Sequence, residues 1–264
     1  MKKFLLPFIA LVLLLSSCGS VPLTGRRQML LVSDQEILSS SLTQYSDYIR
    51  TAKKSTDKNK TDQVVRVGRN IAAATEAYLK ANGLSSEVAN FKWEFNLIDD
   101  NQINAFCMPG GKIVVYTGLL KLASSDDELA VVVGHEVAHA VAKHSNERMS
   151  QQVLTQYGSA VLGQAVSGSS AMVQAVAGTV YGLGTEYGVM LPYSRKHEYE
   201  ADHMGLIFMA MAGYNPDMAV SFWTKMSAAG SSGVPEIMST HPNDTNRIAE
   251  IQKFLPEARK YMKK

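Results

Sequence analysis

His135-Glu136-Val137-Ala138-His139 gives the chain the pattern H-E-x-x-H near the middle of its sequence. An α-helix rises about 1.5 Å per residue with about 3.6 residues per turn, so residues four apart lie on one face. His135 and His139 can therefore bind one metal ion through imidazole nitrogens at about 2.0–2.1 Å. Glu136 then lies beside a water on that ion, as the general base does in zinc peptidases. Surface polar residues that match the pattern by chance are the alternative.

The residues around this pattern predict a buried helix. Ser125 and Glu128 form a capping box, with Ser125 as the N-cap and Glu128 three residues later. Apolar residues then continue through the pattern at Leu129, Val132, Val133, Val137 and Ala140. Buried imidazoles and carboxylates are costly without partners, and a metal ion supplies partners for both histidines at once. A solvated charged face is therefore the poorer explanation.

A catalytic zinc site takes three protein ligands and leaves one position for water, so a third ligand is expected elsewhere in the chain. The segment Glu198-Tyr199-Glu200-Ala201-Asp202 is the best candidate. If it is helical, Glu198 and Asp202 lie on one face and Glu200 points away. One of the two carboxylates can then bind zinc, and the other can accept the remaining ring N–H of a ligand histidine. An amphipathic acidic helix face without metal is the alternative.

With these two segments, several further motifs resemble one family, the gluzincin metallopeptidases that include HtpX, LoiP, BepA and the CAAX prenyl proteases. The resemblance covers nearly all of the chain after residue 20. The motifs that carry it are Val21-Pro22-Leu23-Thr24-Gly25-Arg26, Asn104-Ala105-Phe106, Pro109-Gly110-Gly111, the H-E-x-x-H, Ser194-Arg195 with Glu198 and Ala201-Asp202, and Thr240-His241-Pro242 with Arg247. The resemblance implies that Glu198 is the third zinc ligand and that Asp202 orients a ligand histidine without binding the metal.

The resemblance also implies a role for His241. In relatives the histidine before this proline lies close to the metal, where it stabilises the oxyanion or occupies the open coordination position of a resting state. From the sequence alone, His241-Pro242 is also typical of an ordinary helix start, along which Asp244 and Arg247 could pair. The other candidate histidines match no ligand position and are expected to be structural or solvated: His144, His197 and His203.

The order of the elements predicts an α+β fold, a mainly helical zincin (gluzincin) domain with a small β-sheet. Ser33 opens a helix that runs toward Lys53, and a second helix is expected over Asp62–Ala81 after a polar loop. Two alternating stretches, Phe91–Ile98 and Lys112–Thr117, predict strands. The sheet therefore precedes the zinc helix.

We expect an edge strand of this sheet to line the active-site cleft. The region from Asn104 to Tyr116 would present it, with a bend at Pro109-Gly110-Gly111 that the resembled family shares. An extended peptide can add to such an edge as a further strand. The residues expected on this substrate edge are Asn104, Ala105, Phe106, Pro109 and Gly110. An ordinary hairpin packed under the zinc helix is the alternative.

The amino terminus predicts export from the cytoplasm. Two lysines precede an apolar run over residues 4–15, which is too short to span a bilayer and is typical of a signal peptide. Leu15-Ser16-Ser17-Cys18 then resembles the lipobox of bacterial lipoproteins, so residues 1–17 are expected to be removed and Cys18 acylated. Gly19 at the next position is compatible with sorting to the outer membrane. We therefore expect a lipid-anchored protein of a bacterial cell envelope that faces the periplasm.

Charge and cysteine content exclude other classes. The chain has 26 Lys and Arg against 24 Asp and Glu, and the signal peptide carries two of the lysines and no acid. The mature protein is then formally neutral, and nothing in its charge favours a nucleic acid partner. With Cys18 acylated, Cys107 has no intramolecular partner and is expected to be a small buried residue in a strand. Residues 18–264 are long enough for one domain with a substantial core.

Between Arg148 and Glu186 the chain has no charged residue. Some members of the resembled family have membrane helices around their catalytic elements, so a membrane contact is one interpretation. Repeated Gln, Ser and Gly lower the hydrophobicity below that of a good spanning helix. We therefore expect soluble helices and a mobile loop that covers the cleft and regulates entry.

Site and resemblance together predict a zinc-dependent endopeptidase with one Zn²⁺ per chain, held by His135, His139 and Glu198. Glu136 would be the general base, and His241 would stabilise the oxyanion. The expected substrates are misfolded or unassembled envelope polypeptides, because periplasmic and lipoprotein members of the resembled family act in quality control. One alternative is a chaperone-like lipoprotein with a latent site, and another is a non-proteolytic scaffold.

Overall fold

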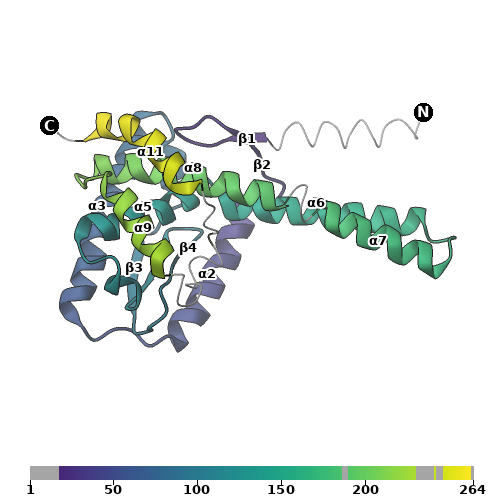
Figure 1. Ribbon diagram of the computed structural model, residues 1–264, viewed down its shortest axis with the longest axis horizontal. Helices are drawn as coiled ribbons and strands as arrows, with labels where there is room; N and C mark the ends of the chain where they lie inside the picture. The colour runs from purple at the N-terminus through teal and green to yellow at the C-terminus, as the bar shows by residue number, and fades with distance from the viewer. Residues whose placement is uncertain (1–17, 186–189, 230–240, 242–245, 263–264) are drawn as a thin grey trace.

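The computed structural model describes residues 18–185, 190–229, 241 and 246–262. Helices dominate this part of the chain (Figure 1). The strands are β1 (Cys18–Ser20), β2 (Arg27–Met29), β3 (Glu94–Ile98), β4 (Ala105–Met108) and β5 (Lys112–Tyr116). The α-helices are α2 (Asp34–Thr51), α3 (Lys58–Ala81), α4 (Ser85–Val88), α5 (Asp126–Val141), α6 (His144–Ala165), α7 (Ala171–Thr185), α8 (Leu191–Met211), α9 (Met218–Ala229) and α11 (Arg247–Ala258). Short 3₁₀ helices are η1 (Leu119–Lys121) and η4 (Arg259–Tyr261). The predicted α+β class is confirmed.

Side-chain caps decide where the first two long helices begin. Ser33 caps α2, as predicted, and forms a capping box with Glu36. α3 begins at Lys58 rather than at Asp62 as predicted, because the Asp57 carboxylate accepts a backbone N–H of the first turn. Residues 58–61 therefore join the helix, whereas the polar residues 53–57 form the expected loop.

The three-stranded sheet has the order β3-β5-β4. β3 pairs with β5 in parallel, and β4 pairs with β5 antiparallel. The turn between β4 and β5 contains Gly110 and Gly111 with φ of 89° and 81°, a backbone conformation that favours glycine. Because β4 stands at the end of the strand order, it is an edge strand of this sheet, as predicted for the region after Asn104.

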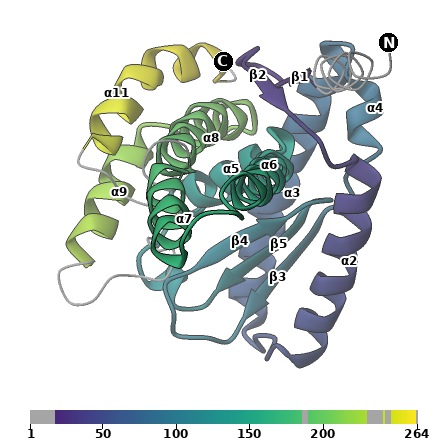
Figure 2. The ribbon, with the colours of Figure 1, turned by 90° about the vertical axis from the view of Figure 1, so that its right-hand side faces the viewer.

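Different helices cover the two faces of this sheet (Figure 2). On one face, Ile113 and Val115 of β5 enter the main hydrophobic core with α3 and α5. On the other face, Val114 and Tyr116 pack with Tyr45 of α2. Such alternation is expected of a strand that is buried on both sides. α5, which carries the H-E-x-x-H, packs beside the edge strand β4.

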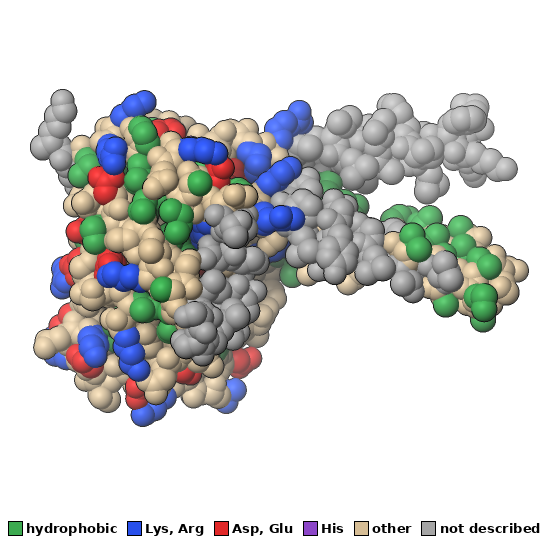
Figure 3. Space-filling model, viewed as in Figure 1, with side chains coloured by type: hydrophobic (Ala, Val, Ile, Leu, Met, Phe, Trp, Pro, Cys, Tyr) green, Lys and Arg blue, Asp and Glu red, His purple; other side chains and the backbone are tan. Residues whose placement is uncertain are grey.

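α6 and α7 form a hairpin that projects from the body of the protein (Figure 1). The two helices confirm the expected helical segment, but their connection at residues 166–170 lies at the outer end of the hairpin. The expected loop over the cleft is therefore not seen at this position, because α6 continues outward for 22 residues. Large hydrophobic side chains are exposed along the hairpin (Figure 3): Met149, Val153, Leu154, Tyr157, Val161, Met172, Val173 and Val180. Within the described ranges, no helix is long and apolar enough to cross a bilayer.

The amino-terminal strands form a small separate sheet. β1 pairs antiparallel with β2, which places Cys18 opposite Met29. β2 also packs against α6. The expected acylation site thus lies in the strand pair beside the root of the hairpin, whereas the expected signal peptide, residues 1–17, lies outside the described residues.

Candidate zinc site

Two crossing helices, α5 and α8, bring the candidate ligands together. At the crossing, a Cβ on Gly134 would come within 2.8 Å of the Gly205 carbonyl oxygen, so the two backbones are in contact. α5 carries His135 and His139 one turn apart, and α8 carries Glu198. All three side chains are buried at the interface between the helices.

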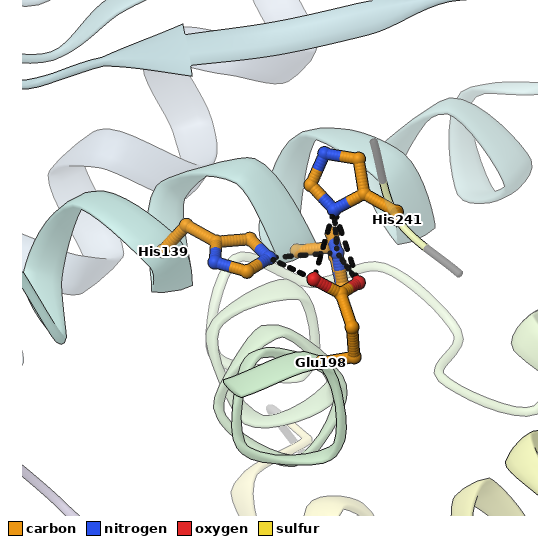
Figure 4. Close-up of side chains that lie close together, drawn as sticks. His139, Glu198 and His241 are labelled. Atoms are coloured by element: carbon orange, nitrogen blue, oxygen red, sulfur yellow. Dashed lines mark hydrogen bonds and ion pairs between the residues drawn. The ribbon is translucent and has the colours of Figure 1, made fainter. Parts of the chain in front are cut away.

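Donor atoms from His135, His139, Glu198 and His241 converge there, all within 4.8 Å of one another (Figure 4). The Nε2 atoms of His135 and His139 are 3.0 Å apart. The Glu198 carboxylate lies 3.2 Å from the first of these nitrogens and 3.4 Å from the second. His241 directs Nδ1 at the same point, 3.0 Å from Glu198 Oε2. The fold thus joins three segments that are far apart in the sequence.

Asp202 lies behind His135. Its Oδ1 accepts a hydrogen bond from His135 Nδ1 at 2.8 Å, which leaves Nε2 as the ring nitrogen that faces the cluster. Arg247 donates to the same carboxylate through Nε and Nη2, both at 2.8 Å, and its guanidinium lies 3.4 Å over the Trp223 ring. The contact between Arg247 and Asp202 was not predicted from the sequence, and Asp244, the partner expected for Arg247, lies outside the described residues.

Burial and neighbouring charges set the protonation of this site. Burial raises the pKa of the Asp202 carboxyl, but the charges and hydrogen bonds of Arg247 and His135 together outweigh burial and hold the pKa below its ordinary value. Burial lowers the pKa of His135, whereas the Asp202 hydrogen bond raises it, with a net rise to about 9. Burial lowers the pKa of His139 well below its ordinary value. Burial also opposes ionisation of Glu198, yet the nearby histidines bring its pKa well below the ordinary value. An ionised Glu198 and a neutral His139 are in the protonation states that zinc binding requires. His135 must lose a proton when zinc binds.

Glu136 is buried on α5 beside the cluster. Its Oε1 has no hydrogen-bond partner among the described residues, and His241 Nε2 lies 3.5 Å from it. A buried carboxylate oxygen without a partner is costly and needs an explanation. Two imidazoles and a carboxylate fit a catalytic zinc ion, for which His₂Glu is an established ligand set, and Glu136 lies where an attacking water would need a base.

A pocket opens from the cluster toward the edge strand. Its lining residues are Asn104, Phe106, Cys107, Glu136, His139, Ser145, Arg148 and His241. A neighbouring pocket shares Cys107, Ser145 and His139 with it and extends to Pro109 and Gly110. Four of the five residues expected on the substrate edge therefore line this pair of pockets. The fifth, Ala105, has its side chain in the core, opposite Val115 of β5.

The remaining histidines in the described ranges are held in hydrogen-bonded pairs. His144 is completely buried, and its Nδ1 lies 2.8 Å from His139 Nδ1. The His197 ring stacks on His144 at 4.2 Å. His203 lies elsewhere and bonds to Glu257. The contact of His144 with His139 was missed because α5 ends between them, so helical spacing from His139 does not apply.

The sequence profile of peptidase family M48 matches residues 63–255, which include the whole converging donor set. The chain belongs to peptidase family M48. The predicted family resemblance is thereby confirmed at the level of M48, and the matched region is a zinc metalloendopeptidase domain. This M48 domain spans α3 to α11, so the whole zinc site lies inside it.

Known M48 relatives of this chain include mitochondrial and bacterial proteins. Mitochondrial metalloendopeptidase OMA1 of Schizosaccharomyces pombe is 38% identical over 175 residues, which cover 66% of this chain and 50% of the relative. The human OMA1 metalloendopeptidase is 29% identical over 252 residues, 90% of this chain and 46% of the relative. The Beta-barrel assembly-enhancing protease of Escherichia coli is 32% identical over 169 residues, 61% of this chain and 34% of the relative. The chain thus spans half the length of these relatives or less.

Proposed function

We propose that this protein is an endopeptidase in which His135, His139 and Glu198 hold zinc. The observation that carries the proposal is the convergence of their donor atoms, together with that of His241, within 4.8 Å. Zinc in this position would polarise a scissile carbonyl and lower the pKa of a water molecule. Asp202 accepts the outer N–H of His135 and so keeps the inner nitrogen of that ring directed at the metal position.

Glu136 is the general base in this proposal. Glu136 lines the pocket, and its Oε1 has no hydrogen-bond partner among the described residues. Glu136 can therefore accept a proton from the attacking water and deliver it to the leaving amine. His241 lines the same pocket with Nε2 3.5 Å from that oxygen. From there His241 can donate to the oxyanion, a contribution of about 2.7–4 kcal/mol for one such donor in other enzymes.

The substrate in this proposal is an extended polypeptide. β4 is an edge strand, and Phe106 of β4 and Asn104 just before it line the pocket that holds Glu136. A peptide can add to this edge only if its own backbone is unpaired, which favours misfolded or unassembled proteins. The Beta-barrel assembly-enhancing protease among the relatives and the lipobox at Cys18 both favour envelope proteins as substrates.

In the same proposal, residues 18–264 form one catalytic domain, anchored by an acylated Cys18 to the outer membrane of a bacterium and facing the periplasm. Labelled palmitate tests the anchor: the label should enter the wild-type chain and be absent from Cys18→Ser. The wild type should also remain with membranes on fractionation, whereas the variant should be released. Equal labelling of the two chains would refute the anchor.

Cleavage assays test the activity and the substrate class together. The chain Gly19–Lys264 should cleave an unfolded outer-membrane protein and spare the same protein after it has folded. A zinc chelator should abolish this cleavage, and added zinc should restore it. Cleavage that survives chelation, or equal cleavage of folded and unfolded protein, would contradict the proposal.

A latent, chaperone-like protein is the second candidate, and the position of His241 Nδ1 among the donors favours it. As a fourth ligand, His241 would fill the place that water needs. His241→Ala separates the two roles. Loss of a fourth ligand should weaken zinc binding and raise turnover, whereas loss of an oxyanion donor should leave zinc affinity unchanged and lower kcat.

A further inference from the structure

The turn between β1 and β2 is connected to His139 by hydrogen bonds through two buried side chains. Thr24 and Arg26 lie on this turn, Glu200 lies on α8, and His144 begins α6. We propose that Thr24 and Arg26, acting through Glu200 and His144, fix the orientation of the His139 ring and are positioning residues for zinc. The proposal rests on His139 as a zinc ligand, as proposed above.

Every link in this series is within hydrogen-bond distance. Thr24 Oγ1 donates to Glu200 Oε1 at 2.5 Å, and Arg26 Nε donates to Glu200 Oε2 at 2.8 Å. His144 Nε2 lies 3.0 Å from Glu200 Oε2, and His144 Nδ1 lies 2.8 Å from His139 Nδ1. His144 is 0% exposed and Glu200 8% exposed, so bulk water cannot replace these partners.

The donors in this series point in one direction. Glu200 accepts hydrogen bonds from Thr24 and Arg26, so as a carboxylate it also accepts the Nε2–H of His144. A neutral His144 then has its lone pair on Nδ1 and accepts the Nδ1–H of His139. His139 is left with a lone pair on Nε2, the nitrogen that faces the donor cluster. The turn therefore selects the tautomer of His139 that can bind zinc.

Additional contacts hold the series in place. Arg26 donates to both oxygens of Glu147 through Nη1 and Nη2, at 2.9 and 2.7 Å. Glu147 also bonds to His197 Nε2 at 2.9 Å, and the His197 ring stacks on His144. A single guanidinium thus joins a carboxylate of α6 to a carboxylate of α8, which the planar fork of arginine allows and the point charge of lysine does not. His144, the first residue of α6, is thereby held against α8.

Glu200→Gln tests the proposal because the amide keeps the shape of Glu200 but places an N–H among groups that are already donors. We expect the zinc dissociation constant of Gly19–Lys264, measured by chelator competition, to rise about 10- to 100-fold. We also expect the visible spectrum of the Co²⁺-substituted chain to change, because the ligand geometry changes. A purely structural role would lower the melting temperature without altering that spectrum.

Glu257→Gln is the matched control, since Glu257 also bonds to a histidine, His203 at 2.8 Å, but outside the donor cluster. Its zinc affinity and Co²⁺ spectrum should equal those of the wild type. If Glu200→Gln does not fold, Thr24→Val decides, because it removes one donor with little change of shape and should weaken zinc binding by a smaller factor.

Wild-type affinity and spectrum in a folded Glu200→Gln, or in Thr24→Val where Glu200→Gln does not fold, would overturn the positioning role. An equal loss of affinity in Glu257→Gln would overturn it as well. These outcomes leave the zinc site itself intact. A wild-type chain that binds no zinc would instead refute the proposed function, and the positioning role with it.

Discussion

Gly134 of α5 and Gly205 of α8 lie backbone against backbone, with no room for a side chain at either position. A Cβ on Gly205 would lie 2.8 Å from the Gly134 carbonyl carbon and 2.8 Å from the His135 backbone nitrogen. This close approach sets how deeply the two helices pack. It therefore sets the distance between His135 and Glu198, although neither glycine can contact a metal.

Gly205→Ala should push the two helices apart. We expect a loss of about 1–3 kcal/mol in the free energy of unfolding, because the methyl group meets backbone that cannot rotate away. Zinc affinity should fall as well, since the His135 and Glu198 donors separate. Chemical denaturation and chelator competition measure the two effects. Gly163→Ala is the control: its Cβ meets nothing within 4 Å, and it should stabilise α6 slightly. Unchanged zinc affinity in Gly205→Ala would contradict this explanation of the site geometry.

Asp202→Asn should weaken zinc binding about 10- to 100-fold, because the amide is a poorer acceptor for His135 Nδ1–H. It should also lower the free energy of unfolding, by up to about 3–5 kcal/mol, because the buried Arg247 loses its two hydrogen bonds to a carboxylate and keeps only the Glu198 carboxylate at 3.7 Å. The matched control is Asp217→Asn, which breaks a surface pair with Arg259 and should cost about 0–1 kcal/mol. Similar losses in both variants would show that the buried pair has no special role.

Glu128 should make the start of α5 sensitive to acid. Burial raises the pKa of this carboxyl, but bonds to Lys225 and Ser124 outweigh burial and hold the pKa below its ordinary value. A carboxyl whose pKa is lower in the folded state contributes stability above its unfolded pKa of about 4.5, and loses that contribution as the pH falls through the folded pKa.

Glu128→Gln tests this linkage. At neutral pH it should lower the free energy of unfolding by about 1–2 kcal/mol, and the difference from the wild type should shrink as the pH falls below 4.5. Urea denaturation of the metal-free chains at a series of pH values measures the difference. Asp62→Asn, in an exposed pair with Lys58, should show a much smaller difference. A difference that stays constant with pH would refute the role assigned to Glu128.

Shortening the hairpin tests whether its outer half covers the cleft. Of the described hairpin residues, only those near the root of α6, Ser145 and Arg148 among them, line the pockets, and Figure 1 places the tip away from the body. Replacement of Gly163–Gly178 by a short linker should therefore leave kcat/KM for a short peptide unchanged. A large change would favour the cover expected from the sequence, in which the hairpin folds back over the cleft.

Local patterns in the sequence predicted the parts of the site that depend on neighbouring residues. Helical spacing placed His135 and His139 on one face, and Ser125 begins α5 as expected from its capping pattern. Glu128 departs from the pattern because its carboxylate bonds to Ser124 instead of the N-cap residue. The facing histidines and the Ser125 cap were predictable because contacts within one helical turn involve residues a few positions apart.

Features that depend on how distant elements pack could not be predicted in this way. The Gly134–Gly205 contact follows from the crossing of α5 and α8, for which a single sequence contains no local signal. The His144 ring contacts His139 because Lys143 adopts a φ of 56° and turns the chain between α5 and α6. Lys143 has this left-handed backbone conformation although it is not a glycine, so its residue type did not predict the turn.

The most direct test of the zinc site and its general base compares zinc content and cleavage of an unfolded protein for Gly19–Lys264 and its Glu136→Gln variant. We expect zinc at about one ion per chain in both proteins, because Glu136 is not a ligand, and cleavage about 10²- to 10⁴-fold slower in the variant, because the general base is lost. Equal cleavage by the two proteins would contradict the role of Glu136, and a wild-type chain without zinc would contradict the site itself.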